Sequence, residues 1–239
     1  MKSIQISNFR FKEFSVEHSR SSMKVGVDGV LIGAWGSVEG HVGMDIGCGC
    51  GLISLMAAQR NKDCVVEAID IHGPSVEEAE SNFKASSMAE RLSARRMDAK
   101  ELPDDESLHG KFDFILSNPP FFNSGISNPA TPREQARHIG SISPAIIVRI
   151  ADKLLRPGGT LSMILPVEEG ERLMSAATIP VERICYVADK CSKPFKRIMI
   201  QMRKGRTLGI KSERLFIRNA DGEYTNEYRS LTAPFYLAF

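Results

Sequence analysis

The chain of 239 residues has no long hydrophobic run, only five cysteines and few aromatic side chains. No stretch approaches the roughly 18 consecutive apolar residues that a membrane-spanning helix needs, so we expect no membrane partner. The N-terminal stretch, MKSIQISNFRFKEF, contains no apolar signal-peptide core. With 42% hydrophobic and 25% charged residues, the composition is that of a globular protein, which we expect to be cytoplasmic.

The cysteines are odd in number, and no two of them form a C-x-x-C pair. This argues against a disulfide framework and against the usual zinc-binding spacings. Cys48 and Cys50 stand between glycines, in a loop where a metal ion would collide with a bound ligand. We therefore expect reduced thiols and no bound metal.

The formal net charge of +2 is unevenly distributed along the chain. Residues 190–218 contain ten lysines and arginines but one acidic residue, Glu213, so the rest of the chain is acidic. A basic segment on an acidic body favours a polyanionic partner such as RNA. A solvated surface rich in lysine would give the same pattern, so charge alone leaves both interpretations open. The RNA contacts expected in this segment are Lys193, Lys196 and Arg197.

The most informative stretch is HVGMDIGCGCGLISL, residues 41–55. Residues 42–46 predict a short buried strand, a helix begins at Leu52, and three glycines alternate between them. Without side chains in the way, a ligand can lie against the backbone, where amides favour an anionic group and the nearby Asp45 could hold a cationic one. This combination indicates a nucleoside-type cofactor with both a carboxylate and an amine. The expected contacts are Asp45, Gly47, Cys48, Gly49 and Gly51.

The glycine spacing excludes two common nucleotide-binding motifs. It lacks the third glycine of G-x-G-x-x-G, and no lysine follows as in a P-loop. A glycine-rich turn without a ligand is the alternative interpretation, and the ends of the next strands argue against it.

Polar side chains follow three further strands of the expected sheet. Asp70 ends the strand at residues 64–69, about 20 positions after the glycine loop, where a carboxylate can accept hydrogen bonds from ribose hydroxyls. Ile71 could lie against an adenine, and Asp98, after residues 92–97, could accept from the adenine amine or simply close a turn. Asn118 follows residues 112–117. Because ligands in parallel sheets bind beyond the carboxyl ends of the strands, all these groups should line one crevice.

The elements alternate in a way that predicts an α/β fold. Helical connections without hairpin signals join the strands, which implies a parallel sheet with crossovers. A capping-box pattern at Ser75 and Glu78 opens one of these helices. Residues 183–188 and 197–202 predict an antiparallel pair at the sheet edge. We expect one domain over residues 1–239, with an N-terminal arm (1–24) and a basic edge hairpin with a C-terminal extension (190–239).

The N-terminal arm interleaves aromatic and basic side chains, a pattern that suits stacking on unpaired nucleotides. The same aromatics could instead pin the arm onto the body, and we favour this simpler interpretation. Residues 24–35, KVGVDGVLIGAW, then predict a turn at Asp28-Gly29 and a helix over residues 30–35.

The run Asn118-Pro119-Pro120-Phe121 has a chemical interpretation. The amide oxygen of Asn118 and the carbonyl of Pro119 can both accept hydrogen bonds from a planar exocyclic amine, which localises its lone pair for attack on a methyl group. Proline fixes the backbone so that the carbonyl points outward. Phe121 could stack on a base turned out of its helix. The long segment 122–140 that follows should also be functional, with Arg133, Arg137 and His138 near RNA phosphates.

The two motifs resemble those of known enzymes. D-x-G-x-G-x-G resembles motif I of class I S-adenosylmethionine-dependent methyltransferases, and NPPF resembles motif IV of amino-methyltransferases. Together with residues 23–35 and the ARH triplet at 136–138, the whole chain resembles the bacterial tRNA(Val) adenine-N6 methyltransferases. The resemblance implies a Rossmann-like, mostly parallel seven-stranded sheet with an antiparallel edge hairpin and helices on both faces. It also implies S-adenosyl-L-methionine as cofactor and adenine 37 of tRNA(Val) as substrate.

The residue roles that the resemblance implies agree with those expected from the motifs. Cofactor contacts fall on Asp45, Gly47, Asp70 and Asp98, catalysis on Asn118 with Pro119, and base stacking on Phe121. Three alternatives stay open: methyl transfer to a guanine N2 amine, methyl transfer to a protein glutamine, and RNA binding without catalysis. The glutamine alternative is disfavoured because only about 40 residues precede the glycine loop, too few for that family's helical substrate-binding domain. We expect a monomer.

Overall fold

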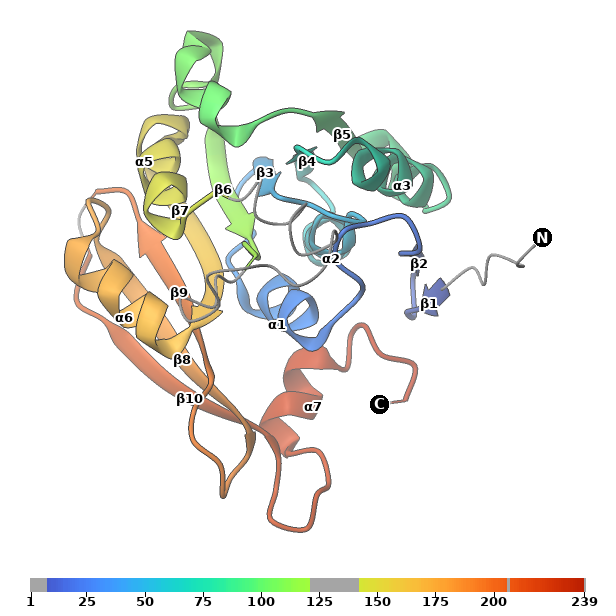
Figure 1. Ribbon diagram of the computed structural model, residues 1–239, viewed down its shortest axis with the longest axis vertical. Helices are drawn as coiled ribbons and strands as arrows, with labels where there is room; N and C mark the ends of the chain where they lie inside the picture. The colour runs from blue at the N-terminus through green and yellow to red at the C-terminus, as the bar shows by residue number, and fades with distance from the viewer. Residues whose placement is uncertain (1–7, 121–141, 206, 239) are drawn as a thin grey trace, which may run out of the picture.

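The computed structural model describes residues 8–120, 142–205 and 207–238, and its centre is a twisted eight-stranded sheet (Figure 1). In spatial order the sheet runs β10-β8-β9-β7-β6-β3-β4-β5. The strands β3 to β7 are parallel, and β9 lies antiparallel between β7 and β8. Their bounds are β3 Val42–Ile46, β4 Val65–Asp70, β5 Leu92–Arg96, β6 Phe112–Ser117, β7 Leu155–Pro166, β8 Val181–Lys190, β9 Arg197–Arg203 and β10 Lys211–Arg218.

Helices cover both faces of the sheet, and each face has its own hydrophobic cluster. Phe114 and Leu116 of β6 belong to one cluster and Ile115 to the other, as the alternation of side chains along a strand requires. The first face carries α1 Val27–Trp35, α2 Leu52–Arg60, α3 Gly73–Lys84 and α7 Asn226–Thr232; the second carries α5 Pro144–Leu154, α6 Val167–Ala176 and the short 3-10 turn η2 Ala99–Asp104. Two further 3-10 turns are η1 Ala89–Arg91 and η3 Glu106–Leu108.

The N-terminal arm folds as a small hairpin of β1 Asn8–Arg10 and β2 Ser15–Glu17. The ring of Phe11 stacks on Tyr236 with 5.9 Å between centroids, and the amide of Lys12 donates to the carbonyl of Phe235 at 2.8 Å. The arm therefore packs against the C-terminal extension, which confirms that its aromatics pin it to the body.

Two expectations about the sheet were wrong. Within the described residues the sheet has eight strands instead of seven, and the β8–β9 pair is not at its edge, because β10 pairs in parallel with β8 and takes the edge position. From Leu215 onward the burial of β10 alternates, with Leu215 and Ile217 buried and Phe216 and Arg218 partly exposed, which fits an edge strand with one covered face.

The turn expected at Asp28-Gly29 was also wrong, since both residues lie inside α1. The helix begins after Gly26, whose carbonyl accepts from the Val30 amide at 3.2 Å. A Cβ on Gly29 would come within 3.2 Å of the Leu52 side chain, so the glycine serves close packing of α1 against α2. Within the described residues, no helix has the length and apolar character needed to cross a bilayer.

Candidate functional site

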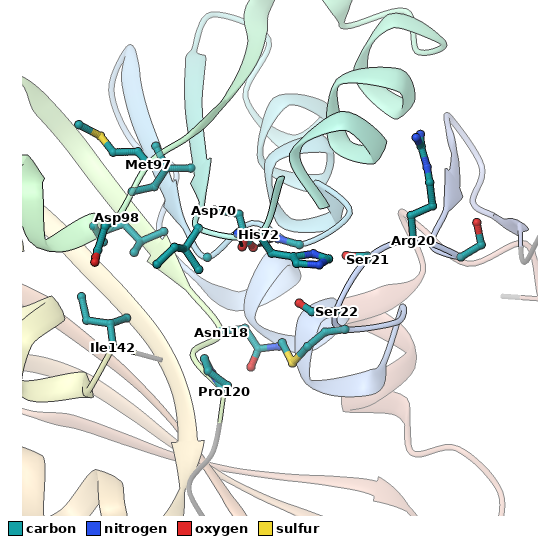
Figure 2. A pocket seen from close by; sticks show the side chains of 18 residues that line it. Arg20, Ser21, Ser22, Asp70, His72, Met97, Asp98, Asn118, Pro120 and Ile142 are labelled. Carbon is teal, nitrogen blue, oxygen red and sulfur yellow. Dashed lines mark hydrogen bonds between the residues drawn. The ribbon is translucent and has the colours of Figure 1, made fainter. Parts of the chain in front are cut away.

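A cavity of about 430 Å³ opens at the carboxyl ends of β3, β4, β5 and β6 (Figure 2). The structure brings seven of the expected site residues to its wall: Gly47, Gly49, Asp70, Ile71, Asp98, Asn118 and Pro120. The wall also contains residues that the sequence did not single out: Ser19, Arg20, Ser21, Ser22, Met23, Ile46, Ile69, His72, Met97, Ala99 and Ile142. The crevice predicted from the strand ends is therefore present as a hollow.

The glycine loop presents bare backbone to this cavity. Gly47, Gly49 and Gly51 all have positive φ angles, of 76°, 54° and 81°. A Cβ on Gly47 would meet nothing within 4 Å, whereas one on Gly51 would lie 2.4 Å from the ring of Phe83. Gly47 thus leaves space for a ligand, and Gly51 is needed for packing against α3.

The loop amides are already used inside the protein. The amides of Gly47 and Cys48 both donate to the carbonyl of Ile69 at 2.9 Å, and that of Gly49 donates to the carboxylate of Asp70 at 2.9 Å. The expectation that these amides would bind an anionic group is therefore not supported by their geometry. What the loop offers is close approach to its backbone.

Asp70 is held firmly at the end of β4. Its second oxygen accepts from the His72 amide at 2.8 Å, and its side chain is 9% exposed at the cavity wall. Burial raises the pKa of this carboxyl, while the hydrogen bonds from His72 and Gly49 oppose the shift. The remaining lone pairs of a fixed carboxylate suit a pair of neighbouring hydroxyls.

Asp98 closes a turn, one of the two roles considered for it, and also lies at the cavity wall. Its side chain accepts from the Lys100 amide at 3.0 Å and caps η2, and it also lines the cavity, half-buried. Ile71 is 39% exposed, and with Met97 it gives this end of the cavity an apolar wall.

Asp45 does not lie at the cavity wall, contrary to expectation. The residue is fully buried, and one carboxylate oxygen accepts from the amide and the hydroxyl of Ser54 at 3.2 and 2.7 Å. Its other oxygen has no hydrogen-bond partner among the described residues. Desolvation raises the pKa of this carboxyl to about 7. Asp45 ties α2 to the sheet, and a direct contact with a cofactor amine finds no support in this position.

Asn118 stands where two cavities meet. A second hollow of about 340 Å³ shares Met23, Gly47, Gly49 and Asn118 with the first. The amide oxygen of Asn118 is buried and has no partner among the described residues, so at the cavity wall it can accept a hydrogen bond from a ligand. The remaining lining residues of the second cavity are Lys24, Gly26, Val27, Asp28, Gly29, Cys48, Cys50, Leu52 and Ile53.

The strand before Asn118 keeps this side chain in place. The hydroxyl of Ser117 donates to the carbonyl of Ile46 at 2.7 Å, which links the ends of β6 and β3, and Pro119 is buried directly after Asn118. The other expected residues of this region, Phe121, Arg133, Arg137 and His138, lie outside the described residues.

Part of the basic segment, the turn between β8 and β9, lies at the same end of the strands as the cavity. The turn between β8 and β9 carries Lys193 and Lys196, both exposed, beside the carboxyl end of β7. Lys196 lies 3.5 Å from Asp189, whereas Arg197 is partly buried and pairs with Asp28 at 2.9 Å. Since Asp28 lines the second cavity, Arg197 contacts the wall of the site.

The sequence analysis did not predict that residues 19–23 of the arm would line the cavity. It also assigned the wrong role to Ser75 and Glu78, which hold them. The capping box expected at Ser75 and Glu78 was wrong, because α3 begins earlier, at Gly73, with His72 as its N-cap. Both side chains instead bind the arm. The available signal was a glutamate, Glu78, beside the apolar positions Val76, Ala79 and Phe83 of this helix.

Comparisons with known proteins agree with this architecture. The family model for the methyltransferase small domain matches residues 30–177. A tRNA1(Val) (adenine(37)-N6)-methyltransferase of Aeromonas salmonicida is 35% identical over 97% of this chain and 98% of its own length. The protein of that name from Parabacteroides distasonis is 36% identical, with 96% and 97% covered.

Solved structures show the fold alone. A predicted O-methyltransferase from Agrobacterium tumefaciens has a TM-score of 0.68 at 15% identity and covers 87% of this chain and 96% of its own. A geranyl diphosphate methyltransferase in complex with SAM has a TM-score of 0.51 at 13% identity, with 74% and 83% covered. Both have the class I methyltransferase fold. From its matched domain and its near full-length relatives, the chain belongs to the methyltransferase small domain family and, within it, to the tRNA1(Val) (adenine(37)-N6)-methyltransferases.

Proposed function

We propose that this protein transfers a methyl group from S-adenosyl-L-methionine to the exocyclic N6 of an adenine in tRNA, adenine 37 of tRNA(Val). The observation that carries the proposal is the buried, unpartnered amide oxygen of Asn118 between two cavities. The names of the relatives supply the tRNA and the position.

The residues at the first cavity fit the adenosine part of this cofactor. Asp70 would hold the ribose hydroxyls, Asp98 the adenine amine, and Ile71 with Met97 the faces of the base. The open side of Gly47 gives room for the chain that leads from the ribose. The second cavity has charges of both signs, Lys24 and Asp28, which suit the zwitterionic end. When bound, the cofactor supplies an electrophilic methyl group.

Asn118 and Pro119 would prepare the acceptor. An adenine amine is a poor nucleophile because its lone pair is delocalised into the ring. Accepting hydrogen bonds from its two N–H groups, one at the amide oxygen and one at the proline carbonyl, localises the lone pair and aims it at the methyl group. This is a positioning effect that needs no strong base.

The exposed lysines would bind the substrate. Lys193 and Lys196 lie at the same end of the strands as Asn118, so a tRNA bound there would lie on the side of the sheet where the cavity opens. Contacts of this kind bind phosphate without reading sequence. For Arg133, Arg137, His138 and Phe121 the corresponding roles stay predictions.

The test is to methylate total tRNA in vitro with labelled cofactor and to digest the product to nucleosides. We expect label in N6-methyladenosine and in tRNA(Val) only. Label in a methylated guanosine would replace this proposal with guanine N2 transfer, and transfer to protein but not to RNA would replace it with glutamine methylation. No transfer with intact RNA binding would favour a non-catalytic RNA-binding protein.

A further inference from the structure

One wall of the first cavity comes from the N-terminal arm. Residues 19–23 line the cavity opposite the strand ends, although some fifty residues separate them from Asp70 and His72 (Figure 2). This wall belongs to no strand of the main sheet, so its position depends on what holds the arm.

The main anchor is Glu78 of α3. Its side chain is 1% exposed, and both carboxylate oxygens accept hydrogen bonds from the arm. One oxygen binds the Arg20 amide at 2.9 Å and the Ser19 hydroxyl at 3.3 Å, and the other binds the Ser21 amide at 2.8 Å. A buried carboxylate is costly unless it is well hydrogen-bonded, and here the arm supplies those bonds.

Two neighbours on the same face of α3 extend the anchor. The hydroxyl of Ser75 accepts from the Ser22 amide at 3.2 Å and lies 2.9 Å from the ring of His72, which also lines the cavity. Asn82 binds both backbone groups of Glu17, at 2.9 and 2.8 Å, and donates to the carbonyl of Cys50 at 2.9 Å. Spaced three and four residues apart, these side chains join the arm to the glycine loop through one helix face.

We propose that Glu78, supported by Ser75 and Asn82, is a positioning residue for cofactor binding: it holds residues 19–23 as a preformed wall of the cofactor cavity. The inference rests on the proposed function in taking S-adenosylmethionine as the occupant. A preformed wall raises affinity because the arm need not be ordered when the ligand binds.

The test uses Glu78→Gln and a matched control, Glu77→Gln, in the full-length protein. Glutamine keeps the size of Glu78 but turns one acceptor into a donor that faces a backbone N–H. Glu77 precedes it, is 69% exposed in its side chain and pairs only with the guanidinium of Arg20 among the described residues. Calorimetry gives the Kd of S-adenosylmethionine, kinetics give KM and kcat, and thermal denaturation gives Tm.

We expect Glu78→Gln to raise the cofactor Kd and KM about tenfold or more while kcat at saturating cofactor and the Kd for tRNA stay near wild type. Glu77→Gln should bind like wild type. An unchanged cofactor Kd in a folded Glu78→Gln variant overturns the inference, and so does an equal loss in both variants.

If Glu78→Gln does not fold, Ser75→Ala decides, since it removes the contacts of the Ser75 hydroxyl to Ser21, Ser22 and His72 and leaves Glu78 in place. A several-fold rise in the cofactor Kd supports the inference, and an unchanged Kd overturns it. Wild-type protein that binds no S-adenosylmethionine would instead refute the proposed function, so the two failures are distinguishable.

Discussion

The two halves of the sheet handle charge in opposite ways. On the side of β3, β4 and α3, carboxylates are buried and bound to backbone or hydroxyl groups, as at Asp45, Asp70 and Glu78. On the side of β8 to β10, charges lie in more exposed pairs, such as Lys196 with Asp189 at 61% and 68% exposure. Buried groups fix geometry, while exposed cations add nearly independent increments of attraction.

Because of this difference, we expect the two halves to respond differently to pH and to salt. Burial raises the pKa values of the Asp45 and Asp70 carboxyls, so their interactions change with protonation, and they are little screened by salt. Interactions of the exposed lysines are screened within about 10 Å at ordinary ionic strength. The cofactor half should therefore be sensitive to pH and to isosteric substitution, and the RNA half to salt. The following variants test this contrast.

The largest effect is expected at Asn118, where the halves meet. Asn118→Ala removes the buried acceptor for the substrate amine, so kcat should fall by roughly 10²–10³-fold, the size seen when one preorganised hydrogen-bonding group is lost. Cofactor and tRNA binding should change little, because neither set of proposed contacts depends mainly on this amide. Single-turnover kinetics with both dissociation constants measured in parallel would check it. Full activity in this variant would contradict the assigned chemistry.

Asp45→Asn should change the pH dependence of stability. The folded-state pKa of about 7 lies above the roughly 3.9 of an unfolded chain, so the native state keeps a proton that the unfolded state has released. The free energy of unfolding contributed by Asp45 is therefore complete below about pH 4, falls as pH rises to about 7, and is constant above it.

Asparagine can still accept from Ser54 but has no such titration. Relative to wild type, Asp45→Asn should gain stability between pH 4 and pH 8, by up to about 4 kcal/mol. Urea denaturation at several pH values measures the difference. If the free energies of unfolding of variant and wild type differ by the same amount at every pH, the argument from the burial of Asp45 is contradicted.

Asp70→Asn should weaken cofactor binding without abolishing folding. The new amide must face either the Gly49 or the His72 N–H, so one of the two bonds that fix the loop becomes a repulsion. We expect the Kd of S-adenosylmethionine to rise roughly 10–100-fold. Asp98→Asn is the comparison, since Asp98 is half-buried and binds one amide, and its effect should be smaller. Equal effects would mean that burial does not set the strength of these contacts.

What the sequence predicted well was what local pattern determines. The glycine loop, the strand ends at Asp70 and Asp98, and the position of Asn118 all follow from alternation and from the rule for parallel sheets. The prediction for Asp45 was wrong by one position along the strand. Its side chain points toward Ser54 of α2, and it is the next residue, Ile46, that lines the cavity.

The failures elsewhere concern partners that are distant in sequence. Ser75 and Glu78 have the spacing of a capping box, and nothing local shows that they bind residues 57 or so positions away. Likewise the parallel pairing of β10 with β8 depends on a long-range register that periodicity does not encode. Local pattern fixes the type of an element, and tertiary contacts decide its neighbour.

The smallest effect tests the RNA half. Replacing Lys193 and Lys196 together by alanine should weaken tRNA binding about three- to tenfold and lower the slope of log K against log salt by about 1 per lysine. Lys211→Ala is the matched control. This exposed lysine begins β10, which is parallel to β8, and so lies at the opposite end of the strands from the β8–β9 turn. Filter binding across a salt series gives both quantities. If Lys211→Ala lowers the slope by as much as one turn lysine does, tRNA binding does not depend on where the lysine lies. The difference between the two halves would then be one of net charge alone.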